Sequence, residues 1–166
     1  RVVMVADDED SNIHLNQADE LAVEKSQAHP ELNIHKIYLD AYRQQSGSGI
    51  DTYPQANDAI NNITNTGTLI WNYSGHGGFK RLAEEVILDQ TIIDRWKNSY
   101  RLPLFITATC DFAPYDNPFV NSIGENILLR PFTGGIALMT TTRLVFSFSN
   151  RLLNNNYLST ALAPDA

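Results

Sequence analysis

A thiol and an imidazole are the side chains of this sequence whose chemistry and setting stand out. Cys110, the only cysteine of the chain, follows an apolar segment, and His76 lies between glycines in the phrase Ser-Gly-His-Gly-Gly. A thiol attacks a carbonyl as the thiolate, and a neighbouring imidazole is the usual means of activating it. We therefore predict that Cys110 is a nucleophile and that His76 is its general base.

Two further groups would complete such a site. The glycines around His76 let the backbone approach a substrate closely, so the N–H groups of Gly77 and of Cys110 itself are the predicted oxyanion donors. Asp7, which follows the first apolar segment, is the predicted carboxylate that orients the imidazole. The chemistry of this set would be acyl transfer through a thioester at Cys110.

Each of these residues also has a plainer explanation. A cysteine after an apolar strand is commonly a small buried hydrophobe, and a lone histidine is commonly a packing residue. The acidic run from Asp7 to Asp10 is compatible with a solvated loop or with a structural calcium ion. A zinc site built from Asp7, His76 and Cys110 is a further alternative, which no paired-ligand spacing supports. The other histidines are expected at the surface or in the core: His14, His29 and His35.

The elements that must position these groups alternate between short apolar runs and helix-length amphipathic segments. Strands are predicted at 2–6, 34–39, 68–73, 104–108 and 135–140, and helices near 15–27, 54–63, 91–97, 123–129 and 148–158. Strand cores such as Leu-Ile-Trp at 69–71 are apolar on consecutive residues, which is typical of a parallel sheet covered on both faces. The expected fold class is α/β, a three-layer α/β/α sandwich with a mostly parallel sheet.

The order of these elements gives the three residues a common location. Functional groups of an open parallel sheet gather beyond the carboxyl ends of its strands. Asp7 follows the first predicted strand, His76 the third and Cys110 the fourth. We therefore expect all three on one rim of the sheet.

Composition sets the limits of the function. A chain of 166 residues, 43% hydrophobic and 19% charged, suits one domain that buries its own core. The net charge is −7 and the twelve Lys and Arg residues are scattered, which argues against a nucleic-acid partner. Because the chain begins at Arg1 inside a predicted strand, we expect residues 1–166 to be a single domain or subdomain excised from a longer protein.

Two phrases of the sequence carry a family resemblance. Asn-Tyr-Ser-Gly-His-Gly-Gly at 72–78, followed by Leu-Phe-Ile-Thr-Ala-Thr-Cys at 104–110, resembles the gingipain-type (C25, caspase-like) cysteine peptidases. In that family one apolar strand ends in Asn-Tyr, a small residue and Gly-His-Gly, and a later strand ends in the cysteine. The resemblance implies a caspase-like fold and a dyad of His76 and Cys110. It also matches Asp7 to the place where relatives have a Glu or Asp that orients the histidine.

A narrower resemblance implies a substrate and a location. Thr-Ala-Thr-Cys-Asp-Phe at 107–112 and Gly-Glu-Asn-Ile-Leu-Leu at 124–129 look most like the sortase-like surface protease of the Bacteroidetes type IX secretion system. The implied task is to cleave the C-terminal sorting domains of secreted proteins and to transfer those proteins to a lipopolysaccharide acceptor. The implied location is the outer membrane or cell surface of a Bacteroidetes bacterium.

The family pattern also sets limits on this chain. Around 14–19 the sequence departs from the arginine-specific members, so trypsin-like selectivity is not expected. Domains of the family usually continue with a further helix and strand, so we expect the fragment to be incomplete at its C-terminal end. The implied chemistry requires no cofactor, and a structural calcium ion is the one metal expected.

A function of a different class stays open. A catalytically silent caspase-like module would bind a partner peptide through the same rim or through an edge strand. Such a module predicts an inert, buried Cys110. Metal-dependent hydrolysis is the third alternative, and it predicts activity that survives alkylation of the thiol.

Overall fold

The centre of the molecule is a parallel five-stranded sheet. The computed structural model describes residues 1–47 and 49–163. The strand order is β2-β1-β3-β7-β8, and each neighbouring pair is parallel. The strands are β1 (Val2–Ala6), β2 (Ile34–Tyr38), β3 (Ile70–Ser74), β7 (Leu104–Ala108) and β8 (Ala137–Met139). All five lie where the apolar runs predicted them, within a few residues at the ends.

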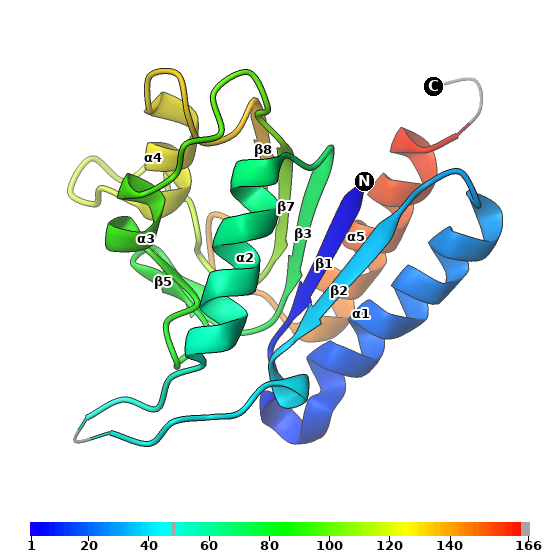
Figure 1. Ribbon diagram of the computed structural model, residues 1–166. Coiled ribbons are helices and arrows are strands. Elements are labelled where there is room, and N and C mark those ends of the chain that lie inside the picture. Colours follow the sequence, from blue (N-terminus) through cyan, green and yellow to red (C-terminus); the bar gives the residue numbers. More distant parts are fainter. Residues whose placement is uncertain (48, 164–166) are drawn as a thin grey trace.

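Helices cover both faces of this sheet (Figure 1). One face carries α1 (Glu9–Ala28) and α5 (Ser147–Ala161), which contact the central strands and each other. On the other face lie α2 (Pro54–Thr66), α3 (Gln90–Asp94) and α4 (Ile123–Leu129). A short 3-10 helix, η1 (Leu39–Ala41), follows β2. The predicted three-layer α/β/α class is therefore confirmed.

Two separate cores explain the consecutive apolar residues of the strands. On β1, Val3 and Val5 pack in the core that includes Ile60 of α2, whereas Val2 and Met4 pack in the core that includes Leu21 of α1. Side chains alternate between the two faces of a strand, so a strand covered on both faces must be apolar throughout.

The first turn of α1 is irregular. Asp10, Ser11 and Asn12 have φ values of 52°, 57° and 62°, which place them in the left-handed region. Asp and Asn tolerate this conformation better than most side chains. The regular helix therefore begins only after Asn12, near the predicted start, although the element as a whole begins at Glu9.

A small antiparallel sheet follows β3 and is absent from the predicted elements. It consists of β4 (Gly77–Gly78), β5 (Arg81–Leu82) and β6 (Leu88–Asp89), in that spatial order. Strands of two residues are too short to show a hydrophobic period, so the sequence pattern did not indicate them.

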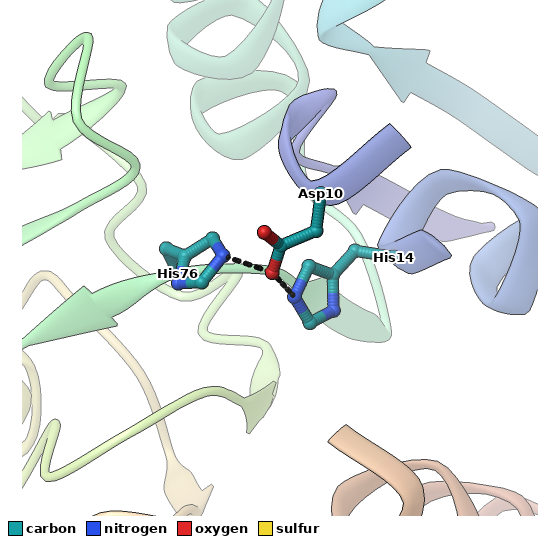
Figure 2. Close-up of side chains that lie close together, drawn as sticks. All are labelled: Asp10, His14 and His76. Carbon is teal, nitrogen blue, oxygen red and sulfur yellow. Dashed lines mark hydrogen bonds and ion pairs between the residues drawn. The ribbon is translucent and has the colours of Figure 1, made fainter. Parts of the chain in front are cut away.

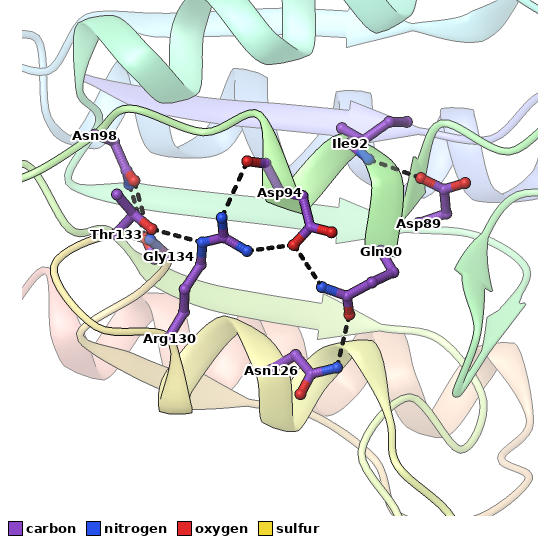
Figure 3. Close-up of polar contacts among 9 residues, drawn as sticks. All are labelled: Asp89, Gln90, Ile92, Asp94, Asn98, Asn126, Arg130, Thr133 and Gly134. Atoms are coloured by element: carbon purple, nitrogen blue, oxygen red, sulfur yellow. Dashed lines mark hydrogen bonds and ion pairs between the residues drawn. The ribbon is translucent and has the colours of Figure 1, made fainter.

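Polar contacts join the segments around α3 and α4 (Figure 3). Arg130 at the end of α4 contacts both the carboxylate and the backbone carbonyl of Asp94 in α3. The buried Asn98 donates to Gly134 O at 2.7 Å and accepts from Gly134 N at 3.0 Å. Gly134 has a φ of 97°, and a Cβ there would lie 2.1 Å from Ile127 O, so this position requires glycine.

None of the helices in the described part of the chain combines the length and the apolar character that spanning a lipid bilayer needs.

Candidate functional site

The register of the sheet brings the candidate dyad to one level. Ser74 at the end of β3 pairs with Ala108 at the end of β7. His76 and Cys110 each lie two residues beyond this pair. The N–H of Gly75 donates to Ala108 O at 3.3 Å, so the two loops are in contact directly after the strands end. The structure thus places His76 and Cys110 on adjacent loops of one rim.

Asp7 lies on the same rim and contacts the backbone of the histidine loop. Its side chain is fully buried, and it accepts hydrogen bonds from Glu9 N at 3.0 Å and from His76 N at 2.8 Å. A Cβ on Gly75 would lie 2.3 Å from the Cβ of Asp7, so glycine is needed for this close approach. Asp7 therefore holds the main chain of the loop, whereas the sequence analysis assigned it to the imidazole ring.

The carboxylate that contacts the imidazole ring is that of Asp10. Figure 2 shows this side chain between two histidine rings, with Asp10 Oδ2 2.8 Å from His76 Nε2. Asp10 belongs to the left-handed turn at the start of α1. The sequence showed an acidic run here, but the unusual backbone that brings Asp10 to the ring leaves no sequence pattern.

The second ring in Figure 2 is that of His14. Its Nε2 lies 3.9 Å from Asp10 Oδ2, and its ring meets that of His76 edge-on at a centroid distance of 5.0 Å. The sequence analysis expected only a surface or core residue at this position. No helical spacing could indicate the pair, because Asp10 lies in the left-handed turn that precedes the regular part of α1.

The pKa values of the two imidazoles are shifted in opposite directions. Burial alone would lower the pKa of His76, but the Asp10 hydrogen bond and the charges of Asp7, Asp10 and Glu9 outweigh it and raise that pKa. For His14, burial and the proximity of His76 lower the pKa. His76 is therefore the imidazole that this environment equips to carry a positive charge.

Cys110 is partly exposed in this structure. Its Sγ lies 3.6 Å from Val145 O, to which the thiol donates a long hydrogen bond. The ring of His76 is meanwhile paired with Asp10. A hydrogen bond between thiol and imidazole therefore requires the thiol to leave Val145 O and to meet Nδ1 of the ring, while Nε2 stays with Asp10.

The pairing of the β4–β5 hairpin shows whether the N–H of Gly77, a predicted oxyanion donor, is already used. Ala83 N donates to His76 O, and Gly77 is paired with Leu82 in the β4–β5 ladder. Hydrogen-bonded and non-hydrogen-bonded pairs alternate in an antiparallel ladder, so the pair of Gly77 and Leu82 exchanges no hydrogen bonds. The N–H of Gly77 is thus not used by the ladder. The oxyanion role of Gly77 and Cys110 stays a prediction.

A cleft of about 420 Å³ opens beside His76. The β4–β5 hairpin forms much of its wall, and Asp111, which directly follows Cys110, also lines it. Side chains of both charges line this cleft, among them Lys80, Arg81 and Glu84. A bound polypeptide would therefore lie against His76 and meet charges of both signs.

Within residues 1–47 and 49–163, metal-ligating side chains gather in two groups. The donor atoms of Asp10, His14 and His76 lie within 4.8 Å of one another, and so do those of Asp7, Asp8 and Glu85. Cys110 belongs to neither group. The structure does not bring Asp7, His76 and Cys110 together as the ligands of one metal.

The acidic group lies behind the histidine loop. Tyr53 donates to Asp8 Oδ2 at 2.6 Å, while Asp8 Oδ1 and Glu85 Oε2 are buried without a hydrogen-bond partner among the described residues. Burial and the charges of Asp8, Asp7 and Glu9 raise the pKa of Glu85, against a hydrogen bond from its own backbone. The calcium expectation stays a prediction, and this group is where such an ion would be held.

Comparison with solved structures identifies the same fold elsewhere. The crystal structure of the Arg-specific cysteine proteinase gingipain R (RgpB) matches with a TM-score of 0.71 and 16% identity, over 99% of this chain and 37% of that one. A complex of the Porphyromonas gingivalis RgpB pro- and mature domains matches at 0.67 and 18% identity, over 95% and 37%. A third structure, described as a protease, matches at 0.61 and 18% identity, over 90% and 30%. At these identities the similarity concerns the fold.

This chain spans a little over a third of each RgpB chain that it matches, at 37%. No curated protein matches it. The model of one protein family, peptidase family C25, matches residues 1–165. That match includes the strand ends that carry Asp7, His76 and Cys110. The chain therefore belongs to peptidase family C25.

Proposed function

We propose that this chain is a cysteine peptidase domain in which Cys110 attacks the carbonyl of a peptide bond and His76 is the general base. The observation that carries the proposal is the register of β3 and β7, which supports a dyad by setting His76 and Cys110 on adjacent loops. Membership of peptidase family C25 supports the reaction class.

The reaction begins with a proton transfer. His76 takes the thiol proton while Sγ adds to the carbonyl carbon, and the carbonyl oxygen becomes an oxyanion that the N–H groups of Gly77 and Cys110 stabilise. The tetrahedral intermediate then breaks the C–N bond, and the leaving amine takes the proton from His76. The product of this half-reaction is a thioester on Cys110.

The second half-reaction releases the acyl group. His76 removes a proton from water or from an acceptor amine, which adds to the thioester carbonyl, and the departing thiolate takes that proton back. Asp10 supports both halves because it holds the ring and stabilises the imidazolium. Asp7 supports them through the backbone amide of His76.

Alkylation tests the dyad directly. Iodoacetamide should label Cys110 rapidly between about pH 6 and 8, because a neighbouring base supplies the reactive thiolate at a pH where a free thiol is mostly protonated. The variant His76→Ala should label slowly, whereas the control His29→Ala should label as the parent does. Slow labelling of the parent protein that is unaffected by His76→Ala would rule out an activated thiol.

We further propose that the substrates are C-terminal sorting domains of secreted proteins, and that the chain belongs to a sortase of the PorU type. The support is the resemblance of 107–112 and 124–129 to that protease. The proposed acceptor is a lipopolysaccharide at the outer membrane or cell surface of a Bacteroidetes bacterium. The reaction itself requires no cofactor, and a structural calcium ion is proposed behind the histidine loop.

The products distinguish this narrower proposal from simple hydrolysis. A secreted protein with its sorting domain is incubated with the enzyme and a small primary amine, and the new C-terminus is analysed by mass spectrometry. A sortase should give the amide of that amine. Free acid as the sole product would refute the transfer step but not the peptidase.

A second candidate function is peptide binding at the edge strand β8. A groove of about 470 Å³, lined mainly by apolar side chains such as Leu128, Leu129 and Leu138, lies beside this strand. Leu129 is 77% exposed, so the apolar surface is available for contact. A bound peptide could add a strand to β8 through main-chain hydrogen bonds. If the chain is such a module, Leu129→Glu should abolish binding of an apolar peptide and Cys110→Ala should not.

A further inference from the structure

The cluster of Asp10, His14 and His76 is a second feature of this rim, and the proposed peptidase reaction uses only part of it. In Figure 2 the carboxylate of Asp10 lies between the two rings. Asp10 Oδ2 is 2.8 Å from Nε2 of His76 and 3.9 Å from Nε2 of His14. The proposed reaction assigns no task to His14.

The distances are close to those of a metal centre. Zinc is held tetrahedrally by imidazole nitrogens and carboxylate oxygens at about 2.0–2.2 Å, which separates neighbouring donor atoms by roughly 3.3–3.5 Å. The separations of 2.8 and 3.9 Å lie on either side of this value. All three donor atoms lie within 4.8 Å of one another. The two separations that involve Asp10 are therefore each within about 0.7 Å of the value for a zinc centre.

The setting of His14 fits a ligand better than a packing residue. The residue is only 8% exposed, yet the 3.9 Å from its Nε2 to Asp10 Oδ2 is too long for a hydrogen bond. The carboxylates of Asp7, Asp8 and Glu9 lie in the same loop and add negative potential around the cluster. A buried nitrogen aimed at a carboxylate without reaching it leaves space for a cation between them.

We propose that Asp10, His14 and His76 bind a zinc ion, and that this ion holds the peptidase in an inactive state by occupying Nε2 of the general base. Three protein ligands leave a fourth position for water, as in many zinc sites. Two imidazoles favour zinc over calcium, which prefers oxygen ligands throughout. The binding of zinc stands on the cluster alone, whereas the inhibition rests on the proposed function.

The inhibition follows because zinc and the thiol proton both need a nitrogen lone pair of the His76 ring. His76 can take the thiol proton only on a ring nitrogen with a free lone pair. When zinc occupies Nε2, the neutral ring carries its own proton on Nδ1, so neither nitrogen can accept the thiol proton. Zinc also binds to Asp10, which then no longer stabilises an imidazolium. Zinc at this site would thus reversibly inhibit the reaction of Cys110 and would not itself hydrolyse peptides.

Binding is tested in a protein that cannot act as a peptidase. The variant Cys110→Ala is titrated with zinc chloride by calorimetry, and one zinc per chain is expected. In the same background, His14→Ala should weaken binding by about 100-fold or more, since even a residue that only supports a metal ligand is worth about 10- to 100-fold. His14→Gln, which keeps a long side chain in the helix, should do the same. The matched control, His29→Ala, should bind as Cys110→Ala does.

Cobalt supplies a second readout that does not depend on activity. Cobalt(II) in the zinc site of Cys110→Ala should show the visible bands of a tetrahedral nitrogen and oxygen site, and His14→Ala should lose them. If Cys110→Ala binds no zinc, or if both His14 variants are folded by circular dichroism and bind it undiminished, the assignment is wrong.

The inhibitory consequence is tested in the active protein. Zinc should suppress the alkylation of Cys110 and the cleavage of peptides, and a chelator should restore both. His14→Ala should keep its zinc-free activity and lose most of the inhibition. Zinc binding by Cys110→Ala together with an inert parent thiol would sink the proposed function and leave the zinc site standing. Equal inhibition of the parent and of His14→Ala by zinc would refute the proposal that zinc inhibits from this site.

Discussion

At the scale of single residues, two carboxylates divide the task of holding His76. Asp7 is buried and binds the backbone amide, whereas Asp10 is at the surface and binds the ring. A buried carboxylate with two N–H donors fixes a loop, because losing either hydrogen bond would leave one buried carboxylate oxygen without its donor. A surface carboxylate can release the ring when a substrate or a metal arrives. Asp7 therefore fixes the backbone of the loop, and Asp10 provides a negative charge that can move toward or away from the ring.

Replacing Asp10 should change the titration of His76. In Asp10→Asn the ring loses its charged partner, so the pKa of His76 should fall, and NMR of the ring protons against pH measures it. A raised pKa in the folded state stabilises the fold below the unfolded value near 6.5, and this stabilisation is lost as pH rises through the folded value. Asp10→Asn should therefore destabilise the protein more at pH 5.5 than at pH 9. The difference should stay below about 1 kcal/mol because both side chains are partly exposed to solvent.

His29→Ala serves as the control for that titration. It removes an imidazole at the far end of α1, so the ring protons of His76 should respond to pH as they do in the parent. An unchanged pKa for His76 in Asp10→Asn would mean that the contact with Asp10 does not persist in solution.

Gly75 provides a second test at this scale. A Cβ there would lie 2.3 Å from the Cβ of Asp7 and 2.4 Å from the hydroxyl of Tyr73, both of which are buried. Gly75→Ala should therefore cost about 1–3 kcal/mol in a urea melt and weaken the bond between Asp7 and the His76 amide. In the control Gly78→Ala the nearest atom is 3.9 Å away, and its stability should change little. Equal stability of the two variants would contradict the close packing of Asp7 against the loop.

The shared location of His76 and Cys110 could be predicted from the sequence, because both follow strands of a parallel sheet and the carboxyl ends of such strands lie at one edge. Gly77 could be named as an oxyanion candidate because it directly follows His76 in the sequence. The contacts of Asp10 and His14 with the His76 ring could not be predicted, because they depend on a turn of three consecutive left-handed residues in a polar run. Such a turn depends on tertiary contacts and has no periodic pattern, whereas strand and helix assignments depend on periodicity.

At the scale of elements, a pair of buried amides joins α5 to the centre of the sheet. Asn72 of β3 donates to Asn154 Oδ1 at 2.7 Å, and Asn154 donates back to Asn72 Oδ1 at 3.2 Å. Both residues are buried. Asn154→Ala should cost about 1–3 kcal/mol because it leaves the Asn72 amide without a partner.

Two further variants make that measurement specific. Asn156→Ala, at an exposed position of the same helix, should change the stability by no more than about 0.5 kcal/mol. Adding Asn72→Val to Asn154→Ala should recover part of the loss, since no unpaired amide remains. A double variant as unstable as the sum of its single changes would mean that the amides do not act as a pair.

The elements also show why strands were easier to predict than their connections. Strands buried on both faces show uninterrupted apolar runs, and the helix at Ile123–Leu129 was predicted with its observed ends. Its Ser122 and Glu125 form a reciprocal capping box, a contact that depends on neighbouring residues only. The hairpin of β4 and β5 depends instead on the close approach of Gly77 to Thr109, which lies beyond the end of β7, where a Cβ would be 2.8 Å from Thr109 Oγ1. Local patterns cannot indicate such contacts.

At the scale of the whole molecule, the negative charge is distributed unevenly. Nineteen acidic and twelve basic residues give a net charge of −7, and several of the acids converge on one rim. Asp7, Asp8 and Glu85 have donor atoms within 4.8 Å of one another, and two of the buried oxygens have no partner among the described residues. Like charges this close are unfavourable unless a proton or a cation lies between them. The calcium prediction therefore concerns the group of Asp7, Asp8 and Glu85 at this rim.

Calcium should stabilise the fold through this group. With calcium at about 100 times its dissociation constant, binding to the folded state alone adds about 2.7 kcal/mol, which for a chain of this size is roughly 5–10 °C in Tm. Differential scanning calorimetry with calcium chloride and with a chelator measures it. Glu85→Gln should abolish the gain and raise the Tm in the chelator, because it removes one of the crowded charges. Glu84→Gln, an exposed neighbour with the same change of charge, should keep the gain. If calcium leaves the parent unchanged while acid stabilises it, the carboxylates share a proton and the calcium prediction is wrong.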